Sequence, residues 1–275
     1  MKNSNNSPNK SWWDNNPMTY VEGKVNVNWD DSRRFVTEKV QFEKLNQDYL
    51  NTNPYLKTFF NDGNIRRSFK GKRILDIGTG WGTSSLLLES CEGRVTAIDL
   101  SDSSIAGAKK NHELFGEGSA EIIKMDAENL EFPNETFDYI YSWGVIHHSR
   151  STETIVGEID RVLKPGGKGL IMVYNRYSTR YYLVGLWYLL IKGKIFKGES
   201  FQSVQKYFTD GYWHRHFTPK EFGQILQERG LDVDKIELTY MKRRIFPGIK
   251  EGSVLDEQLK KKFGWLLVAT FSKPT

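Results

Sequence analysis

A short apolar strand that runs directly into a glycine-rich loop is the feature that most restricts how this chain can fold. The strand Ile74-Leu75-Asp76-Ile77 is followed by Gly78-Thr79-Gly80-Trp81-Gly82, so glycine occupies every second position of the loop. Glycine permits positive φ and lets a ligand approach the backbone closely. A helix that begins just after such a loop directs its N-terminal N–H groups toward the ligand. The segment therefore predicts a ligand-binding strand–loop–helix unit, against the plainer interpretation of a tight turn.

Strands and helices alternate along the part of the chain that contains this loop. The expected strands are residues 73–77, 94–99, 120–125, 137–143 and 168–174, with helices between them at 83–90, 101–115 and 151–163. Such alternation is typical of βαβ units. Outside this part, helices are expected at 31–50, 55–69 and 218–229, a basic and aromatic helical insertion at 176–209, and strands at 231–241 and 265–272. The pattern predicts an α/β fold with a doubly wound, mostly parallel sheet.

The overall composition excludes some classes of protein. The 275 residues include 39 Lys or Arg against 34 Asp or Glu, and this net charge of +5 permits an anionic substrate or membrane surface without arguing for nucleic acid. The single cysteine, Cys91, excludes a disulfide framework or cysteine-rich metal site and fits a reducing compartment. The first ten residues lack the apolar stretch of a signal peptide. The longest apolar run, Tyr181–Ile191, is about half of what a membrane span needs. We therefore expect a cytoplasmic protein without stable membrane insertion.

Three of the expected strands offer a carboxylate at or next to their ends. Asp76 lies inside the glycine motif, Asp99 ends the next strand, and Asp126 follows the strand after that. Ligands bind at the carboxyl ends of the strands in open α/β sheets, where an acidic residue about 20 positions beyond the glycine loop hydrogen-bonds ribose hydroxyls. Asp76 favours an ammonium group over a pyrophosphate, and Thr83 replaces the third glycine of a G-x-G-x-x-G dinucleotide fingerprint. The set fits a cationic adenosyl amino acid better than NAD, and the alternative role for Asp126 is a helix N-cap.

Three further motifs follow the glycine loop in order, and together with it they resemble a known family. They are Phe137-Asp138-Tyr139-Ile140, Gly144-Val145-Ile146-His147-His148 and Arg161-Val162-Leu163-Lys164-Pro165-Gly166-Gly167. Residues 70–175 thus resemble a class I S-adenosylmethionine-dependent methyltransferase of the small-molecule type, related to the ubiquinone and menaquinone methyltransferases. The resemblance implies a Rossmann-like sheet of seven strands, the last of which (265–272) runs antiparallel.

The resemblance also implies a cofactor and a domain arrangement. The cofactor would be S-adenosyl-L-methionine, released as S-adenosyl-L-homocysteine, and no metal is expected. The expected cofactor contacts are Asp76, Gly78, Thr79, Gly80, Asp99, Leu100, Asp126, Ala127 and Ser142. The expected divisions are a disordered tail (1–10), an N-terminal helical lid (11–70), a cofactor-binding core (71–175), an inserted helical cover over the substrate (176–216) and the completion of the core sheet (217–275).

Candidates for the acceptor side lie beyond the fourth strand and near the N-terminus. His147 and His148 are candidate general bases, with the alternative that they only shape the pocket, and His214 is a further candidate. The H-x-H pair at 214 and 216 lacks the cysteine or carboxylate partners of a metal site. The expected substrate or lid residues are Trp12, Trp13, Tyr20, Trp143, Tyr174 and Arg215. The N-terminal aromatic residues are equally consistent with a hydrophobic staple onto the core.

The apolar segment Tyr181–Ile191 leaves three interpretations open. It is a buried helix, a membrane-surface contact or a dimer patch, and burial or self-association is favoured. A homodimer is therefore one expected state of the protein.

The function we expect is methyl transfer to an O, N, S or C atom of a small-molecule acceptor that is anionic or partly apolar. The alternative, RNA or protein methylation, lacks the D/N-P-P-Y/F motif, because Ser142-Trp143-Gly144-Val145 stands in its place. Asp76 and Thr83 disfavour a nicotinamide oxidoreductase. A non-catalytic adenosylmethionine-binding module is the alternative of another class.

Overall fold

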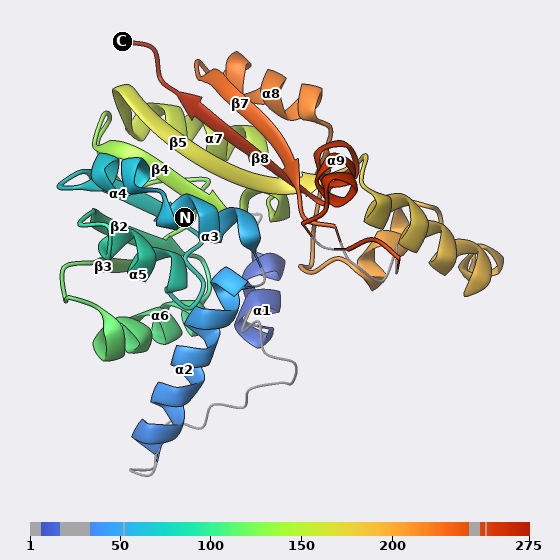
Figure 1. The fold of residues 1–275 in the computed structure, drawn as a ribbon, viewed down its shortest axis with the longest axis horizontal. Helices are drawn as coiled ribbons and strands as arrows, with labels where there is room; N and C mark the ends of the chain where they lie inside the picture. Colours follow the sequence, from blue (N-terminus) through green and yellow to red (C-terminus); the bar gives the residue numbers. More distant parts are fainter. Residues whose placement is uncertain (1–6, 17–33, 52, 242–247, 251) are drawn as a thin grey trace. The chain divides into compact units, whose positions relative to one another are not determined.

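The computed structural model describes residues 7–16, 34–51, 53–241, 248–250 and 252–275 (Figure 1). The chain divides into two compact units. The N-terminal unit consists of Lys10–Tyr141 and Arg161–Lys164. The C-terminal unit consists of Met1–Asn9, Ser142–Asp160 and Pro165–Thr275. Tyr20, a predicted lid residue, lies outside the described residues.

The N-terminal unit builds strands and helices around the glycine loop. Its helices are α1 (Ser7–Asn15, begun in the C-terminal unit), α2 (Arg34–Asn51), α3 (Pro54–Asn61), α4 (Gly63–Phe69), α5 (Thr83–Glu89) and α6 (Asp102–Phe115). Its strands are β1 (Arg73–Ile77), β2 (Arg94–Asp99), β3 (Glu121–Lys124) and β4 (Phe137–Trp143, completed in the C-terminal unit), in the order β3-β2-β1-β4. β1 is parallel to β2 and β2 to β3, while α5 packs on β2 and α6 on β3 (Figure 1). The predicted βαβ arrangement is confirmed here.

Two sequence expectations differ from the structure in this unit. Residues 7–10, expected in a disordered tail, form the beginning of α1. The helix expected at 55–69 is two helices, because Asp62 adopts an extended conformation and its carboxylate accepts hydrogen bonds from the N–H groups of Asn64 and Ile65. A side chain that caps a new helix in this way competes with continuation of the old one.

The C-terminal unit carries the antiparallel strands. Its elements are η1 (Ile146–His148), α7 (Thr152–Val162, ended in the N-terminal unit), β5 (Leu163–Asn175), η2 (Arg180–Val184), η3 (Trp187–Ile191), η4 (Lys194–Lys197), η5 (Ser203–Tyr207), β6 (His216–Phe217), α8 (Pro219–Glu228), β7 (Asp232–Thr239), α9 (Val254–Phe263) and β8 (Leu266–Ser272). β8 lies between β5 and β7 and is antiparallel to both, while β6 pairs in parallel with the end of β5. The predicted fold class and antiparallel last strand are confirmed, with β6 and α9 as unpredicted additions.

The apolar segment Tyr181–Ile191 is helical, but its interpretation as a buried helix is wrong. Residues 179–191 form one helical stretch that includes the wide π-type turns of η2 and η3. Leu183, Leu190 and Ile191 are 46%, 53% and 74% exposed. One face of this stretch is therefore left uncovered by the described residues.

The tryptophan inside the glycine loop belongs to the core. Trp81 is buried against Phe42 of α2, with ring centroids 5.3 Å apart. A Cβ at Gly107 in α6 would meet the Trp81 ring at 2.9–3.0 Å, so only glycine leaves room for that ring. This packing holds the loop between α2 and α6 and leaves its glycine backbone as the part able to meet a ligand.

Candidate functional site

The three loop glycines all adopt left-handed backbone conformations. Their φ values are +74° at Gly78, +56° at Gly80 and +83° at Gly82. A Cβ at Gly82 would lie 3.1 Å from Ala108 in α6, so this glycine allows the loop and the helix to pack closely. A Cβ at Gly80 would have no described atom within 4 Å. The backbone at Gly80 is therefore an open point of the loop, as ligand approach requires.

Backbone hydrogen bonds fix the loop to the neighbouring strand. The N–H groups of Gly78 and Thr79 both donate to the carbonyl of Ile98, at 2.8 and 3.0 Å. The Thr79 hydroxyl donates to Ser85 at 3.0 Å. Thr79, a predicted cofactor contact, is thus buried and engaged in holding the loop in shape.

Asp99 links the end of β2 to this open point of the loop. Its Oδ2 accepts from the Gly80 N–H at 2.9 Å, and its Oδ1 accepts from the Ser101 N–H at 2.9 Å. Burial raises the pKa of Asp99 to about 6, although these backbone hydrogen bonds oppose the shift. Each carboxylate oxygen accepts more than one hydrogen bond, so this side chain retains capacity for ribose hydroxyls.

Asp76 is the more deeply buried carboxylate, at 1% exposure. Its Oδ2 accepts from the Ser84 hydroxyl at 2.6 Å, whereas its Oδ1 has no hydrogen-bond partner among the described residues. Burial raises the pKa of Asp76 to about 6, and the nearby charge of Asp99 adds to the shift. A buried acceptor without a donor is costly, so Asp76 fits a site completed by a cationic or hydrogen-bonding ligand.

The remaining predicted cofactor residues lie at the ends of β2, β3 and β4. Leu100 follows Asp99 and is partly exposed. Asp126 and Ala127 lie in a turn after β3, where the Asp126 carboxylate accepts from the Glu128 N–H at 3.0 Å. Asp126 thus caps a turn, and the helix N-cap interpretation is wrong because no helix follows it. Ser142 is fully buried and belongs to the C-terminal unit.

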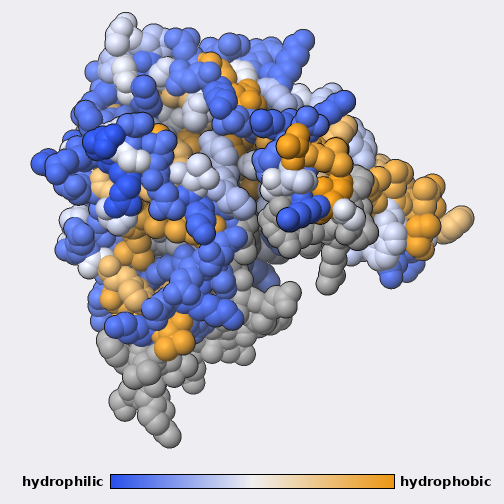
Figure 2. All heavy atoms as spheres, in the orientation of Figure 1, coloured by the Kyte–Doolittle hydropathy of each residue, from blue (hydrophilic) through white to orange (hydrophobic). Residues whose placement is uncertain are grey.

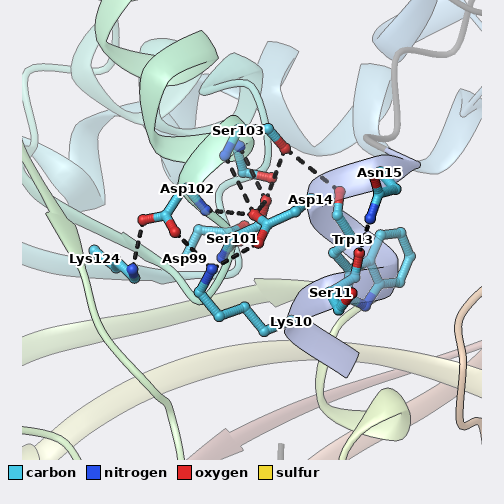
Figure 3. Close-up of polar contacts among 11 residues, drawn as sticks. Lys10, Ser11, Trp13, Asp14, Asn15, Asp99, Ser101, Asp102, Ser103 and Lys124 are labelled. Carbon is cyan, nitrogen blue, oxygen red and sulfur yellow. Dashed lines mark hydrogen bonds and ion pairs between the residues drawn. The ribbon is translucent and has the colours of Figure 1, made fainter. Parts of the chain in front are cut away.

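Helix α1 is joined to the N-terminus of α6 by a carboxylate that sequence reasoning missed (Figure 3). Oδ1 of Asp14 accepts from the Ser101 hydroxyl at 2.8 Å and from the N–H groups of Asp102 at 2.7 Å and Ser103 at 3.4 Å. A carboxylate at a helix N-terminus is stabilised by the free N–H groups and the helix dipole. Asp14 of α1 therefore caps the N-terminus of α6. This contact includes Ser101, which lies two residues after Asp99 in the chain.

Lysines strengthen this contact, which we call the α1 latch. Lys10 lies 2.6 Å from Asp14 and 2.5 Å from Asp102, and Lys124 lies 2.5 Å from Asp102 (Figure 3). Burial would raise the pKa of Asp14, but hydrogen bonds from Lys10 and the α6 terminus outweigh it and leave the pKa lowered. The latch holds the predicted lid residues Trp12 and Trp13 on α1, with their rings 4.6 Å apart.

Four of the five histidines gather around one tyrosine in the C-terminal unit. The His147 ring lies 4.1 Å from that of His148 and 4.0 Å from that of Tyr174. The His216 ring lies 5.8 Å from Tyr174 and 5.4 Å from His214. The structure thus brings together three predicted candidates, His147, His148 and His214, with Tyr174. His216, in the unpredicted β6, completes this histidine cluster.

Burial keeps the histidine cluster neutral. It lowers the pKa of His148 to about 4, although a hydrogen bond to the Trp213 carbonyl opposes the shift. Burial first, and neighbouring histidines second, lower the pKa values of His147 and His216 well below the usual value, and burial lowers that of His214. Neutral imidazoles and aromatic rings make a surface suited to a polar but uncharged group.

The two candidate bases differ in their hydrogen bonds. Nδ1 of His148 lies 2.9 Å from the Trp213 carbonyl, and since a carbonyl only accepts, this nitrogen carries the proton. The backbone carbonyl of His148 accepts from the side-chain amide of Asn9. Neither ring nitrogen of His147 has a hydrogen-bond partner among the described residues. The orientation and tautomer of His148 are therefore fixed, while those of His147 are not.

Arg215 is held by carboxylates instead of lying free for an anionic substrate. Its guanidinium pairs with Glu153 of α7 at 2.8 Å and with Glu221 of α8 at 2.9 Å. Its backbone N–H donates to the His147 carbonyl at 2.8 Å. Arg215 thus fastens the loop that carries His214 and His216, and we leave it out of the acceptor site.

The described part of the chain contains no group of three or more His, Cys, Asp or Glu side chains arranged to hold a metal ion. Within the same residues, no helix combines the length and apolar character needed to cross a bilayer.

Comparison with known proteins shows the class of this domain. Residues 75–171 match the family described as a methyltransferase domain. A solved chain from the complex between the Haloferax volcanii Trm112 methyltransferase activator and a methyltransferase superposes with a TM-score of 0.58 and 18% identity, over 88% of this chain and 96% of that chain. Residues 75–171 are therefore similar to a methyltransferase domain, and the fold of the chain is that of a solved methyltransferase.

Within this class the chain is similar to ubiquinone methyltransferases. It is 31% identical to the ubiquinone biosynthesis O-methyltransferase of Paramagnetospirillum magneticum over 177 residues, which are 64% of this chain and 65% of that protein. It is 38% identical to the phosphatidylethanolamine N-methyltransferase of Cereibacter sphaeroides over 110 residues, 40% of this chain and 53% of that protein. The chain thus covers less than two thirds of either relative.

Proposed function

We propose that this protein is an S-adenosylmethionine-dependent methyltransferase that acts on a small, partly apolar acceptor. The observation that carries the proposal is the joining of Asp99 to the open glycine Gly80, beside the buried Asp76 with its unpartnered oxygen. When bound, S-adenosylmethionine would supply a methyl group carried by a sulfonium sulfur. The acceptor nucleophile would bond to the methyl carbon as the carbon–sulfur bond breaks, and S-adenosylhomocysteine would leave. The residues at this site fit that cofactor.

The roles of the cofactor residues follow from their environments. Asp99 would accept hydrogen bonds from the ribose hydroxyls, because its oxygens retain lone pairs beside the loop. Asp76 would offset the ammonium charge of the cofactor, directly or through water. Gly80 leaves the backbone open, and Asp126 would lie toward the adenine from the end of β3. The latched α1 would cover this edge and exclude water.

We assign acceptor binding to the histidine cluster around Tyr174. Its neutral imidazoles and aromatic rings favour an uncharged polar group attached to an apolar body, and the pairing of Arg215 argues against an anionic one. The names of the relatives, which refer to ubiquinone biosynthesis and phosphatidylethanolamine, support acceptors with an apolar portion.

Of the candidate bases, His148 is favoured. Its Nδ1 proton is donated to the Trp213 carbonyl, so the lone pair of this tautomer is on Nε2, and we assign that nitrogen to accept a proton or hydrogen bond from the acceptor. A conjugate-acid pKa of about 4 makes His148 a weak base. It would remove a proton from an acceptor group that is already acidic, and would mainly orient, by a hydrogen bond, an acceptor group that is not acidic. Most of the rate enhancement would then come from positioning.

Calorimetry with S-adenosylmethionine and S-adenosylhomocysteine tests the cofactor assignment. We expect micromolar binding, about −8 kcal/mol, and a loss of about 1–3 kcal/mol in Asp99→Ala, which removes a charge-assisted acceptor. Asp234→Ala removes a surface carboxylate on β7 and is the matched control. Absence of binding in the wild-type protein would refute the proposal. Binding without transfer of tritiated methyl into any cell metabolite fraction would favour a non-catalytic module.

A further inference from the structure

The arm, residues 176–209, carries an exposed apolar face that the cofactor and acceptor sites do not use. Figure 2 shows hydrophobic residues gathered along this segment, which follows β5 in Figure 1. Its apolar side chains with more than a third of their surface exposed are Tyr177, Tyr182, Leu183, Leu186, Trp187, Leu190, Ile191, Ile195, Phe196 and Tyr207. Phe196, at 91%, is almost fully exposed. Contiguous patches of this kind mark interaction surfaces.

One face of the arm packs against other residues of the arm, and the exposed face lies on the opposite side. A Cβ at Gly185 would lie 2.9 Å from the Phe201 ring, so the helical stretch 179–191 and the segment after η4 are in close contact. The Tyr188 ring stacks on those of Tyr207 and Phe208, with centroids 5.4 and 5.7 Å apart. Because this side is filled, the opposite side is the one available to a partner.

The charges of the arm have one sign near its apolar face. Residues 176–198 include five Lys or Arg and no Asp or Glu, and Arg176 pairs with Glu221 of α8 at 2.9 Å, which leaves Arg180 and three lysines. Nζ of Lys192 lies 4.7 Å from the centre of the exposed Trp187 ring, while Nζ of Lys194 lies 4.1 Å from that of Tyr207, at the border with the packed side. The next acidic residue, Glu199, is bonded within the arm to Lys206 and Tyr207. The exposed apolar face is therefore accompanied by a net positive charge.

We propose that the arm docks the protein onto the surface of an anionic lipid bilayer. Apolar side chains flanked by Trp, Tyr and Lys are the composition of helices that lie in the membrane interface. The 13 residues of the helical stretch 179–191 span roughly 20 Å, which suits contact with the surface and is too short to cross it. A symmetric dimer through this face would bring the lysines of both copies together, so a bilayer fits the charge better than a second copy.

The arm is also connected to the proposed acceptor site, a point that rests on the proposed function. The Tyr181 ring, at the base of the arm, lies 4.8 Å from the ring of His216 in the histidine cluster. Arg180 lies over the Trp265 ring at 4.9 Å, and Trp265 lies 4.6 Å from Tyr174. A bilayer at the arm would thus bring a lipid-dissolved acceptor near the cluster.

Vesicle co-sedimentation of the full chain tests the docking without cofactor or acceptor. We expect binding to vesicles of 30% phosphatidylglycerol in phosphatidylcholine, and much weaker binding to pure phosphatidylcholine. Leu190→Asp should lower the affinity at least tenfold, because it places a charge on the apolar face. Replacing Lys192, Lys194 and Lys197 by Gln should lower it by about fivefold per lysine, roughly a hundredfold in all, and remove most of its salt dependence.

Val40→Asp is the matched control, because Val40 of α2 is 60% exposed but lies outside the arm. It should bind vesicles like the wild type, and circular dichroism should show that all variants are folded. Equal vesicle binding by Leu190→Asp would overturn the proposal. Absence of vesicle binding, together with a dimer that Leu190→Asp dissociates in light scattering, would also overturn it in favour of a second copy. Since no turnover is measured, these results are independent of whether methyl transfer is found.

Discussion

Replacing Asp14 by Ala is expected to release α1 from α6 while the rest of the N-terminal unit stays folded. The substitution removes three hydrogen bonds to the α6 terminus and the pairing with Lys10 (Figure 3). α6 keeps its own N-cap, since the Ser101 hydroxyl still accepts from the Ser104 N–H. The change therefore acts on the docking of α1 more than on the integrity of α6.

The size of the effect follows from the contacts. An N-cap carboxylate contributes about 0.5–2 kcal/mol, a charge at a helix N-terminus about 0.3–1 kcal/mol and a surface ion pair about 0–1 kcal/mol. The Asp14 side chain is 26% exposed, so solvent screening reduces the sum. We expect a loss of about 1–2 kcal/mol, which is a 5- to 30-fold increase in the undocked population.

Amide hydrogen exchange of residues 10–15 measures this population directly. Exchange there should accelerate by the same 5- to 30-fold, with little change in β1 or β2, and cofactor affinity should fall if α1 covers the cofactor edge. Asn15→Ala is the control, because Asn15 donates only within α1, to the Ser11 carbonyl. If Asp14→Ala and Asn15→Ala show the same exchange in α1 as the wild type, the latch does not hold the helix and the reasoning is refuted.

Four further outcomes are expected. Asp76 and Asp99 have folded-state pKa values of about 6, above the 3.8 of an ordinary Asp, so the cofactor-free fold should lose stability as pH rises from about 4 to 6, by at most roughly 3 kcal/mol per carboxyl in urea titrations. Cofactor affinity should show the opposite trend and fall up to about tenfold per pH unit per carboxyl below pH 6, because the ionised forms bind; a flat calorimetric profile between pH 5 and 7 would contradict this. His148→Ala should reduce kcat by about 10²-fold or more and remove an acidic limb centred near pH 4, whereas an intact limb would exclude His148 as its source. Gly107→Ala should cost about 1–3 kcal/mol of unfolding free energy, because its Cβ would meet the Trp81 ring at 2.9 Å, and unchanged urea midpoints would show that the ring yields freely.

Local patterns in the sequence were sufficient to predict the strand, glycine loop and acidic residues of the proposed cofactor site. The run Ile74–Ile77 is apolar because β1 is buried on both faces, and the glycines after it mark a loop whose φ values few other residues adopt. Asp99 and Asp126 could be placed at strand ends because strands in a parallel sheet present their carboxyl ends at one edge. Each of these inferences depends on neighbours within a few positions of the chain.

Other features could not be predicted, because the residues close to them in sequence carry too weak a pattern. β6 is two residues long and exists only because His216 and Phe217 pair with the end of β5. α9 was not expected, although Ser253 caps it by accepting from the Asp256 N–H. The pKa of His148 is about 4 instead of the ordinary histidine value of 6.5, because burial disfavours its charged form. Burial of that kind is decided by segments distant in sequence.

The sequence by itself determined the strand–loop–helix unit and the acidic strand ends, from which the class of cofactor was predicted. Only the tertiary structure decided that Asp14 caps α6 across 87 positions of the chain, that four histidines meet around Tyr174, and that the apolar arm is exposed. Hydrophobic periodicity and turn residues act over a few positions, so they are legible in sequence. Whether an apolar or titratable side chain is covered depends on which distant segment packs against it, and that is a property of the folded chain alone.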